Sequence, residues 1–215
     1  MSDVLTLSDV SKSFGALKVT DAVSFGVPKG QALGIIGPNG AGKSTLFNLI
    51  TGNFLPDAGR ITFLGRDVTR SPAMDRVRMG VGRSFQIPQP FDGLTVFENL
   101  LTAAAYGRGS TEAQVADDCA EVLRDTGLLA RANQIAGSLS LLDRKRLELA
   151  RAMATGPELL LLDEIAGGLT DGECKALIDT IKGLHAQGTT IIWIEHVLHA
   201  LNSVCLLYTS PSPRD

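Results

Sequence analysis

The chain has 215 residues, of which 44% are hydrophobic and 20% charged, as is ordinary for a globular protein that buries a sizeable core. Its net charge of −3 and its aromatic content of 5% give no support for a general nucleic-acid binder. No apolar run approaches the roughly 18 residues of a membrane-spanning helix. Three widely spaced cysteines match no metal or disulfide framework. We expect a soluble protein of a reducing compartment, without a nucleic-acid partner.

The N-terminal region is rich in predicted strands. Residues 4–10 have the composition of a strand, and residues 19–27 alternate apolar and polar side chains with the period of a half-buried strand. A turn at residues 28–30 leads into a short buried strand at 32–36. This beginning differs from a plain alternation of strands and helices.

Residues 37–45 fit the phosphate-loop pattern G-x-x-x-x-G-K-[ST] and lie between the strand at 32–36 and a predicted helix at 46–50. Glycines let the backbone wrap an anion, towards which the N–H groups and the helix N-terminus point. Lys43 is expected to reach the β- and γ-phosphates, and the Ser44 hydroxyl to bind Mg²⁺. The predicted nucleotide-phosphate site comprises Gly37, Asn39, Gly40, Ala41, Gly42, Lys43, Ser44 and Thr45.

Two more strands are predicted at 60–64 and 79–85, the second with glycines that mark close packing or a bulge. Gln86 ends it and a proline-rich stretch follows, which indicates a subdomain boundary. The next segment is helical. A capping-box pattern at Thr95–Glu98 opens one helix, a second spans about 112–126, and Ser140 begins a third that ends at Gly156.

Strands return after residue 156. Residues 159–162 are continuously apolar, as in a parallel strand buried on both faces, and Asp163 and Glu164 follow at its carboxyl end. A helix at about 173–187 precedes a strand at 189–194, which ends at Glu195 and His196. In the Walker B arrangement the first acid holds Mg²⁺, and a second carboxylate can deprotonate the attacking water. Without the phosphate loop, a surface acid pair would explain Asp163 and Glu164 equally well. His196 on its own fits a structural histidine better than a catalytic one.

Taken together, residues 1 to about 204 resemble the ATPase subunit of an ATP-binding-cassette transporter. The resemblance implies that Phe14 stacks on adenine, that Gln86 is the Q-loop glutamine and that His196 is the switch histidine. It places the signature motif at residues 139–143, Walker B at 159–164 and the D-loop, with Asp171, at 168–171.

The family's fold is α/β, a P-loop NTPase (RecA-like) core with an N-terminal antiparallel β subdomain and an inserted helical subdomain. The resemblance implies a core of residues 1–86 and 156–204 and a helical signature subdomain at 87–155. Two copies would enclose two ATP molecules head to tail. Each site would use Glu164 as general base and His196 at the γ-phosphate. Mg²⁺ would be held by Ser44, Gln86 and Asp163.

Two departures from the family pattern stand out. The signature, usually L-S-G-G-Q, reads L-S-L-L-D here, so only Leu139 and Ser140 match. Ser140 would meet the γ-phosphate in the other copy's site, and it also fits a simple helix cap. Ile165 replaces the proline that usually follows the Walker B glutamate. We expect hydrolysis to survive both changes.

The stretches 83–86, 95–100, 141–152 and 163–169 resemble the subgroup that powers import of branched-chain amino acids. The implied partners are a second ATPase subunit, transmembrane permeases that contact residues 86–97, and, indirectly, a periplasmic or extracellular substrate-binding protein. The implied location is the cytoplasmic face of the inner membrane. Alternatives are an exporter ATPase and a soluble cassette ATPase of repair or translation, which usually carries a coiled-coil insertion or a second cassette. A GTPase would need an Asn-Lys-x-Asp motif, which the sequence lacks.

Residues 205–215 read C-L-L-Y-T-S-P-S-P-R-D, a peptide encoded by what looks like a transposon-end sequencing adapter. We expect this tail to be non-native, with the natural chain truncated near Val204. A genuine Ser/Pro-rich tail is the alternative.

Overall fold

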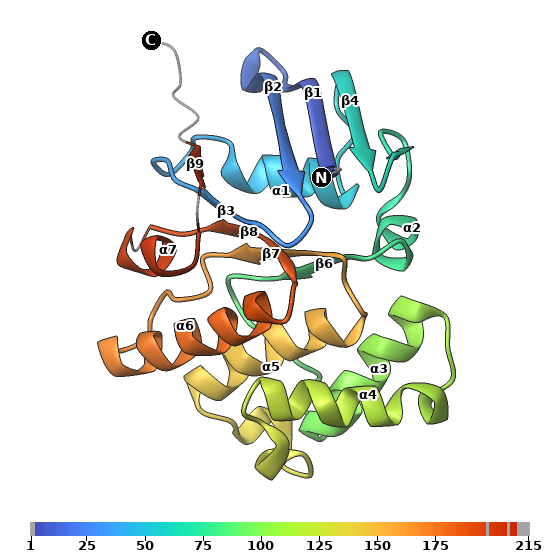
Figure 1. Ribbon diagram of the computed structural model, residues 1–215, viewed down its shortest axis with the longest axis vertical. Coiled ribbons are helices and arrows are strands. Elements are labelled where there is room, and N and C mark those ends of the chain that lie inside the picture. The colour runs from blue at the N-terminus through green and yellow to red at the C-terminus, as the bar shows by residue number, and fades with distance from the viewer. Residues whose placement is uncertain (1–2, 197, 206, 210–215) are drawn as a thin grey trace.

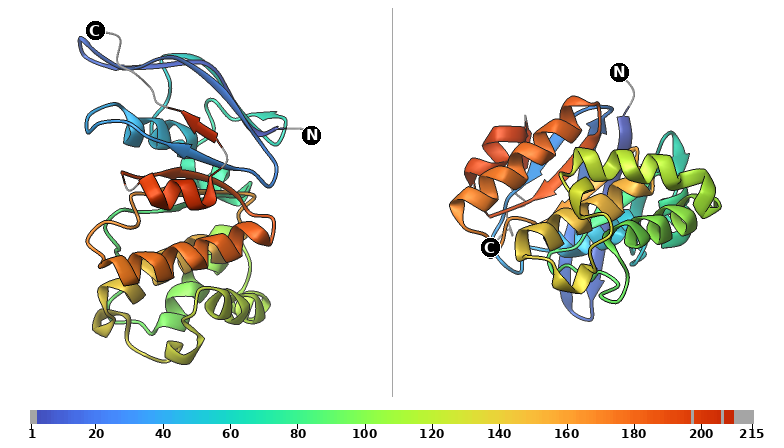
Figure 2. Two further views of the ribbon diagram at one scale, coloured as in Figure 1. Left: turned by 60° about the vertical axis from the view of Figure 1, so that its left-hand side comes forward. Right: turned by 90° about the horizontal axis from the view of Figure 1, so that it is seen from below.

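The computed structural model describes residues 3–196, 198–205 and 207–209. Figures 1 and 2 show an antiparallel sheet on one side of a parallel sheet and a group of helices on the other. Helix α1 (Lys43–Thr51) lies between the two sheets. Within the described residues no helix combines the length and the apolarity that crossing a membrane requires.

The antiparallel sheet has the strand order β2-β1-β4-β5 and consists of β1 (Asp3–Phe14), β2 (Leu17–Pro28), β4 (Ala58–Phe63) and β5 (Arg66–Asp67). Its inward side chains include Leu5 and Leu7 of β1 and Phe63 of β4, each about 1% exposed. The predicted N-terminal antiparallel subdomain is therefore confirmed. The two-residue β5 was not predicted, since it is too short to show a period.

The second sheet is entirely parallel and has the order β6-β7-β8-β3-β9. Its strands are β3 (Ala32–Ile35), β6 (Val81–Ser84), β7 (Leu159–Asp163), β8 (Thr190–Ile194) and β9 (Leu207–Thr209). Every residue of β3, β7 and β8 is buried, which explains their continuous apolar sequences. The carboxyl ends of the strands meet at one edge, the usual ligand edge of such sheets. This arrangement confirms the predicted P-loop core.

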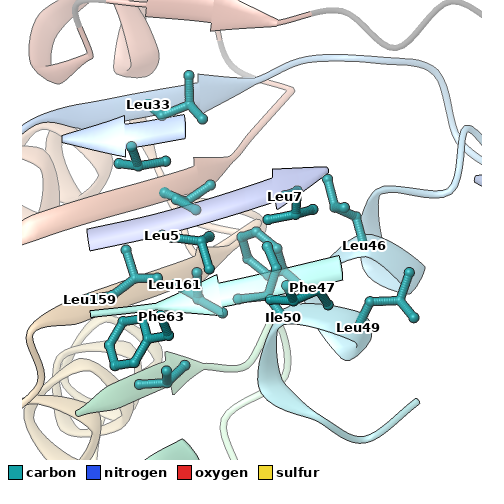
Figure 3. Close-up of a cluster of buried hydrophobic side chains, with 14 of the residues drawn as sticks. Leu5, Leu7, Leu33, Leu46, Phe47, Leu49, Ile50, Phe63, Leu159 and Leu161 are labelled. Carbon is teal, nitrogen blue, oxygen red and sulfur yellow. The ribbon is translucent and has the colours of Figure 1, made fainter. Parts of the chain in front are cut away.

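Helix α1 joins the two sheets through one apolar core. Phe47, Leu49 and Ile50 are at most 1% exposed, and Figure 3 shows them among leucines of both sheets and Phe63. Burying each such side chain contributes about 1.5–3 kcal/mol. The helix that begins at the phosphate loop is therefore fixed along its length.

The opposite face of the parallel sheet is covered by α5 (Leu141–Ala154), α6 (Asp171–Ala186) and α7 (Leu198–Val204). Beyond them lie α3 (Val96–Arg108) and α4 (Glu112–Asp125), which pack on α5 around a separate apolar core. Thr95 and Glu98 form the predicted capping box at the start of α3. Residues 87–155, all of them described, contain no strand and only one isolated bridge, between Thr95 and Ile135.

A short helix that was not predicted, α2 (Ala73–Arg78), follows β5 and carries the fully buried Arg76. One guanidinium nitrogen of Arg76, Nη1, donates hydrogen bonds to the carbonyl oxygens of Leu49 (2.7 Å) and Ile50 (2.9 Å). These carbonyls lie in the last turn of α1, where Leu49 also accepts a hydrogen bond from the N–H of the capping residue Gly52 at 3.4 Å. The guanidinium thus adds partners at the end of the helix, where the regular intrahelical hydrogen bonds run out. Burial lowers the pKa of Arg76 to about 10, so at neutral pH the side chain is a buried cation.

The end of the chain adds one helix and one strand. Helix α7 precedes β9, which lies within the segment expected to be a non-native tail and pairs in parallel with β3. Residues 206 and 210–215 of the same segment lie outside the described residues. The strand predicted at 79–85 begins only at Val81, because Gly80 has a φ of 106° that a strand does not accommodate. Gly82 does mark close packing, since a Cβ there would lie 2.9 Å from Pro157 Cβ.

Candidate active site for nucleotide hydrolysis

The phosphate loop connects β3 to α1 at the carboxyl edge of the parallel sheet. Gly42 is the residue that precedes the first helical turn, and its φ of 82° favours glycine. A Cβ at this position would lie 2.6 Å from the carbonyl oxygen of Val19 in β2. A glycine is therefore needed here both for the backbone conformation and for the approach of the neighbouring strand.

Lys43 is folded into the loop. The side chain is buried, and Nζ donates hydrogen bonds to the carbonyl oxygens of Gly37 (2.7 Å) and Pro38 (2.8 Å). Ser44 follows in the first turn of α1 and is exposed. The N–H groups of this turn have no intrahelical acceptor, so the loop combines a lysine cation with free donors. That is the chemistry of a phosphate site.

Glu164 is held between two side chains from neighbouring strand ends. Its Oε2 accepts a hydrogen bond from Gln86 Nε2 at 2.7 Å, and its Oε1 lies 2.8 Å from His196 Nε2. Gln86, Glu164 and His196 follow β6, β7 and β8, which are adjacent in the sheet. The structure thus brings together three residues that lie far apart in the sequence.

The backbone at Glu164 adopts an unusual conformation. Its φ is 45°, in the left-handed region that residues with a side chain seldom occupy. The Glu164 N–H donates to the carbonyl oxygen of Ile194 at 2.9 Å, which ties this turn to the end of β8. Such strain costs about 1–3 kcal/mol and persists only where the surroundings enforce it. The residue that carries this strain is the one whose carboxylate contacts Gln86 and His196.

Asp163 forms an ion pair that sequence analysis missed. Arg83 Nη2 donates to Asp163 Oδ2 at 2.7 Å, and Arg83 Nη1 donates to Asn48 Oδ1 of α1, also at 2.7 Å. Both partners of the ion pair are about nine-tenths buried. The Arg83 guanidinium also lies over the rings of Phe47 (5.5 Å) and Phe85 (5.0 Å). The Walker B acid is therefore tied to the phosphate-loop helix. An arginine inside a predicted buried strand was the available signal.

Glu195 is a second residue that sequence analysis noted without assigning it a role. It is 2% exposed, and its carboxylate accepts hydrogen bonds from the backbone N–H groups of Ala166 (3.2 Å) and His196 (3.1 Å). It therefore connects the turn after Glu164 to the turn that carries His196. Its position at the end of a buried strand was visible in the sequence, but its partners were not.

Phe14 is the last residue of β1, and the end of this strand is anchored by Asp57. Asp57 accepts hydrogen bonds from Lys12 Nζ (2.8 Å) and the Ser13 N–H (2.7 Å), and these bonds hold its pKa below the ordinary value. The Phe14 ring is 45% exposed and packs edge to face on Phe54, with centroids 5.4 Å apart. Part of the Phe14 ring thus remains accessible to a ligand.

Ser140 and Asp171 are not part of the Glu164 cluster. Ser140 is exposed at the N-terminus of α5, where Oγ accepts from the Asp143 N–H (3.2 Å) and donates to Asp143 Oδ2 (3.0 Å). Asp143 is paired in turn with Arg131 at 3.1 Å. Asp171 is the exposed first residue of α6. Within the part of the chain that the structure describes, their contacts are those of helix starts.

The donors near Asp163 fit a magnesium ion. Asp163 Oδ1 and the amide oxygen of Gln86 are not engaged by the contacts above, and the Ser44 hydroxyl is exposed. Mg²⁺ prefers such oxygen ligands and is commonly held by one or two protein groups, water and phosphates. No group of three His, Cys, Asp or Glu side chains in the described ranges could hold a metal alone. The nucleotide would therefore have to supply further ligands.

Known proteins with similar sequences are consistent with a nucleotide site. The family model described as "ABC transporter" matches residues 20–167. The chain is 39% identical over 210 residues to the high-affinity branched-chain amino acid transport ATP-binding protein LivG of Salmonella typhimurium, covering 90% of this chain and 82% of that protein. It is 34% identical to the probable LivG of Methanocaldococcus jannaschii, covering 96% and 85% of the two chains.

Solved structures agree with the sequence comparison. A nucleotide-free ATP-binding cassette from an ABC transporter superposes with a TM-score of 0.87 at 31% identity, over 97% of this chain and 87% of the other. Another cassette, in its ADP conformation, gives a TM-score of 0.85 at 32% identity, over 95% and 85%. The phosphate loop, the strand-end acids and these likenesses together show that the chain belongs to the ABC transporter family, as one of its ATP-binding and ATP-hydrolysing subunits.

Proposed function

We propose that this subunit powers import of branched-chain or related amino acids, and that Glu164 is its general base. The assignment of Glu164 as the base rests on one observation: Gln86 and His196 each contact one of the two carboxylate oxygens of Glu164. The relatives that support the substrate class are named for branched-chain amino acid transport. Substrate selection itself would reside in the permease and in a periplasmic or extracellular binding protein.

In the proposed reaction, ATP binds with its adenine against Phe14 and its phosphates in the loop 37–45. Phosphate oxygens replace the two carbonyls as partners of Lys43. Glu164 takes a proton from a water whose oxygen attacks the γ-phosphorus, while the bond from that phosphorus to the β–γ bridging oxygen breaks. His196 donates a hydrogen bond to the γ-phosphate. When bound through Ser44, Gln86 and Asp163, Mg²⁺ would neutralise the charge that builds up on the phosphates.

We further propose that the active form is a dimer. Ser140 and Asp171 lie outside the Glu164 cluster, on exposed helix starts. In a head-to-tail pair each Ser140 would reach the other copy's γ-phosphate and each Asp171 the dimer seam. Residues 1–86 with 156–204 would move as the core, and residues 87–155 as the helical subdomain.

The permease would contact the region from Gln86 to Phe97, beside a groove of about 230 Å³ between α1, α2, β6, α3 and α5. Such a contact would keep the subunit at the cytoplasmic face of the inner membrane. Movement of the helical subdomain on ATP binding would then act directly on the permease.

The hydrolytic part of the proposal is tested with the purified chain and Mg-ATP. Glu164→Gln should retain nucleotide binding and lose turnover, and ATP should shift it to a dimer in light scattering. Normal turnover in this variant would refute the base assignment, and a monomer at saturating ATP would refute the proposed dimer.

The transport part needs a cellular assay. The chain is expressed in a strain that lacks the ATPase of its branched-chain amino acid importer but keeps the permease and the binding protein. Restored uptake of labelled leucine that is absent with Lys43→Ala supports the substrate class. Failure of uptake, with ATPase activity and permease association intact, would contradict it.

A further inference from the structure

Helix α5 contacts the segment that carries Gln86 through three charged side chains. Lys145, Glu148 and Arg151 are spaced three residues apart and therefore share one side of the helix. The facing segment, residues 85–91, is called the Gln86 segment below. Nothing in the sequence motifs assigns these three side chains a task, although two of them are almost fully buried, Lys145 at 3% and Glu148 at 5% exposed.

Each contact falls on the backbone or a ring of the Gln86 segment. Lys145 Nζ donates to the carbonyl oxygen of Gln86 itself at 3.2 Å. Arg151 Nη1 donates to the carbonyl oxygen of Gln89 at 2.8 Å, and its guanidinium lies 5.2 Å from the Phe91 ring centre. Charged donors make stronger hydrogen bonds than neutral ones. The segment is thus held at both ends by α5.

Glu148 occupies the middle of this row. Its Oε2 lies 3.1 Å from Arg151 Nη1, and the backbone N–H groups of Phe85 and Gln89 also interact with its carboxylate. A buried carboxylate is costly unless such partners surround it. Its position next to a loop whose backbone groups need partners indicates a role in fixing that loop.

We propose that Lys145, Glu148 and Arg151 are positioning residues that hold the Gln86 segment on α5 and thereby set the approach of Gln86 to Glu164. The side chain of Gln86 reaches Glu164 at 2.7 Å, so displacement of its backbone would open that contact. This inference rests on the role given to Gln86 under Proposed function.

The same helix also carries the signature residue. Ser140 caps its N-terminus, and α5 has 14 residues, which makes a rod of about 21 Å. One rigid element therefore links Gln86 in a copy's own site to Ser140 in the partner's site. Opening or closing of the dimer at Ser140 would then be transmitted to Gln86 through three side chains.

The first test is hydrogen exchange of the Gln86 segment in the full chain. Glu148→Gln and Lys145→Met should speed exchange within residues 85–91 by roughly tenfold while strand β7 stays protected. Asp118→Asn is the control, because it also removes a carboxylate paired with an arginine, Arg108, in the helical region but away from this segment. Lys145→Arg keeps a donor and should restore protection. Unchanged exchange in both Glu148→Gln and Lys145→Met would overturn the proposal.

The second test is kinetic. Both variants should lower kcat by roughly 10- to 100-fold with nearly unchanged nucleotide affinity, because only the site geometry is disturbed. Combining either with Gln86→Ala should add little to the effect of Gln86→Ala alone, since all act through one contact. Multiplicative losses would show a general structural effect and refute the positioning role. Full turnover in Gln86→Ala would refute the role of Gln86, while faster exchange in the variants would still establish the hold of α5.

Discussion

The two halves of the proposed ATPase site are built in different ways. The half around Glu164 depends on contacts between strand ends, with Gln86 and His196 reaching it from residues 78 and 32 positions away. The half around Ser140 depends on one helix start, where Ser140 and Asp143 are three positions apart. The first half is assembled by the whole fold, and the second by local capping. Substitutions should therefore affect them differently.

The largest expected effect comes from Glu164→Gln, which changes the central residue of the half around Glu164. Loss of a general base costs about a thousandfold in kcat, within the range for such groups. Nucleotide affinity should stay near that of the unchanged chain, because the phosphate loop is untouched. Single-turnover hydrolysis and equilibrium binding of a fluorescent ATP analogue measure the two quantities separately. A matched fall in affinity would place Glu164 in ATP binding and leave the base unassigned.

Arg83→Met tests how much the ion pair with Asp163 stabilises the half of the site around Glu164. It leaves Asp163 buried without its cation, so the free energy of unfolding should fall by about 3 kcal/mol. Lys29→Met is the control, because Lys29 and Glu158 form a 3.0 Å pair that is largely exposed. That change should cost under about 1 kcal/mol. Urea unfolding measures the free energy of unfolding of both variants. Equal decreases would mean that the Arg83–Asp163 pair stabilises the fold no more than an exposed pair does.

Ser140→Ala tests the half of the site around Ser140. Removing a serine cap should lower stability by about 1 kcal/mol. Thr95→Ala is the matched control, since Thr95 caps α3 by the same hydrogen bond, from the Glu98 N–H at 3.2 Å, and lies outside the proposed nucleotide site. If Ser140 also meets the partner's phosphate, kcat should fall about tenfold in Ser140→Ala only. ATPase rates corrected for the folded fraction would show this, and equal rates in the two variants would leave Ser140 as a cap.

The smallest effect is a pH dependence at the boundary between the halves, where Glu148 of α5 faces the Gln86 segment. Burial raises the pKa of Glu148 above its ordinary 4.5, although Arg151 opposes the shift. An acid with a raised pKa in the folded state contributes stability that is present at low pH and lost as the pH rises through that pKa. The Tm of the unchanged chain relative to Glu148→Gln should therefore decline as the pH rises from about 4.5. A flat difference would mean that the carboxylate is not buried in solution.

Much of the fold followed from sequence because its signals are local. The buried runs of β3, β7 and β8, the capping box at Thr95 and the glycine turn before Lys43 each lie within a few residues. Helix α2 was missed because six residues after a proline show no clear period, and its buried residue is an arginine. Strand β9 was missed because its segment was set aside as a tail.

The candidate site shows the same division. Sequence motifs indicated Lys43, Asp163 and Glu164, since each has a fixed place relative to a strand end. They did not indicate that Arg83 would pair with an acid 80 positions away, or that Glu195 would join two turns. Such pairings depend on strand order and register, which a single sequence does not state.

Arg76 has an electrical consequence for the phosphate loop. The aligned peptide dipoles of a helix place roughly half an elementary charge at each end, positive at the N-terminus and negative at the C-terminus. The buried guanidinium lies at the negative end of α1, on the carbonyls of Leu49 and Ile50. Its positive charge offsets the partial negative charge at this end, which would repel an incoming anion. The partial positive charge at the other end, near Lys43, then acts on the anion without that opposition. A cation at the far end of the helix thus makes the loop more attractive to a polyphosphate.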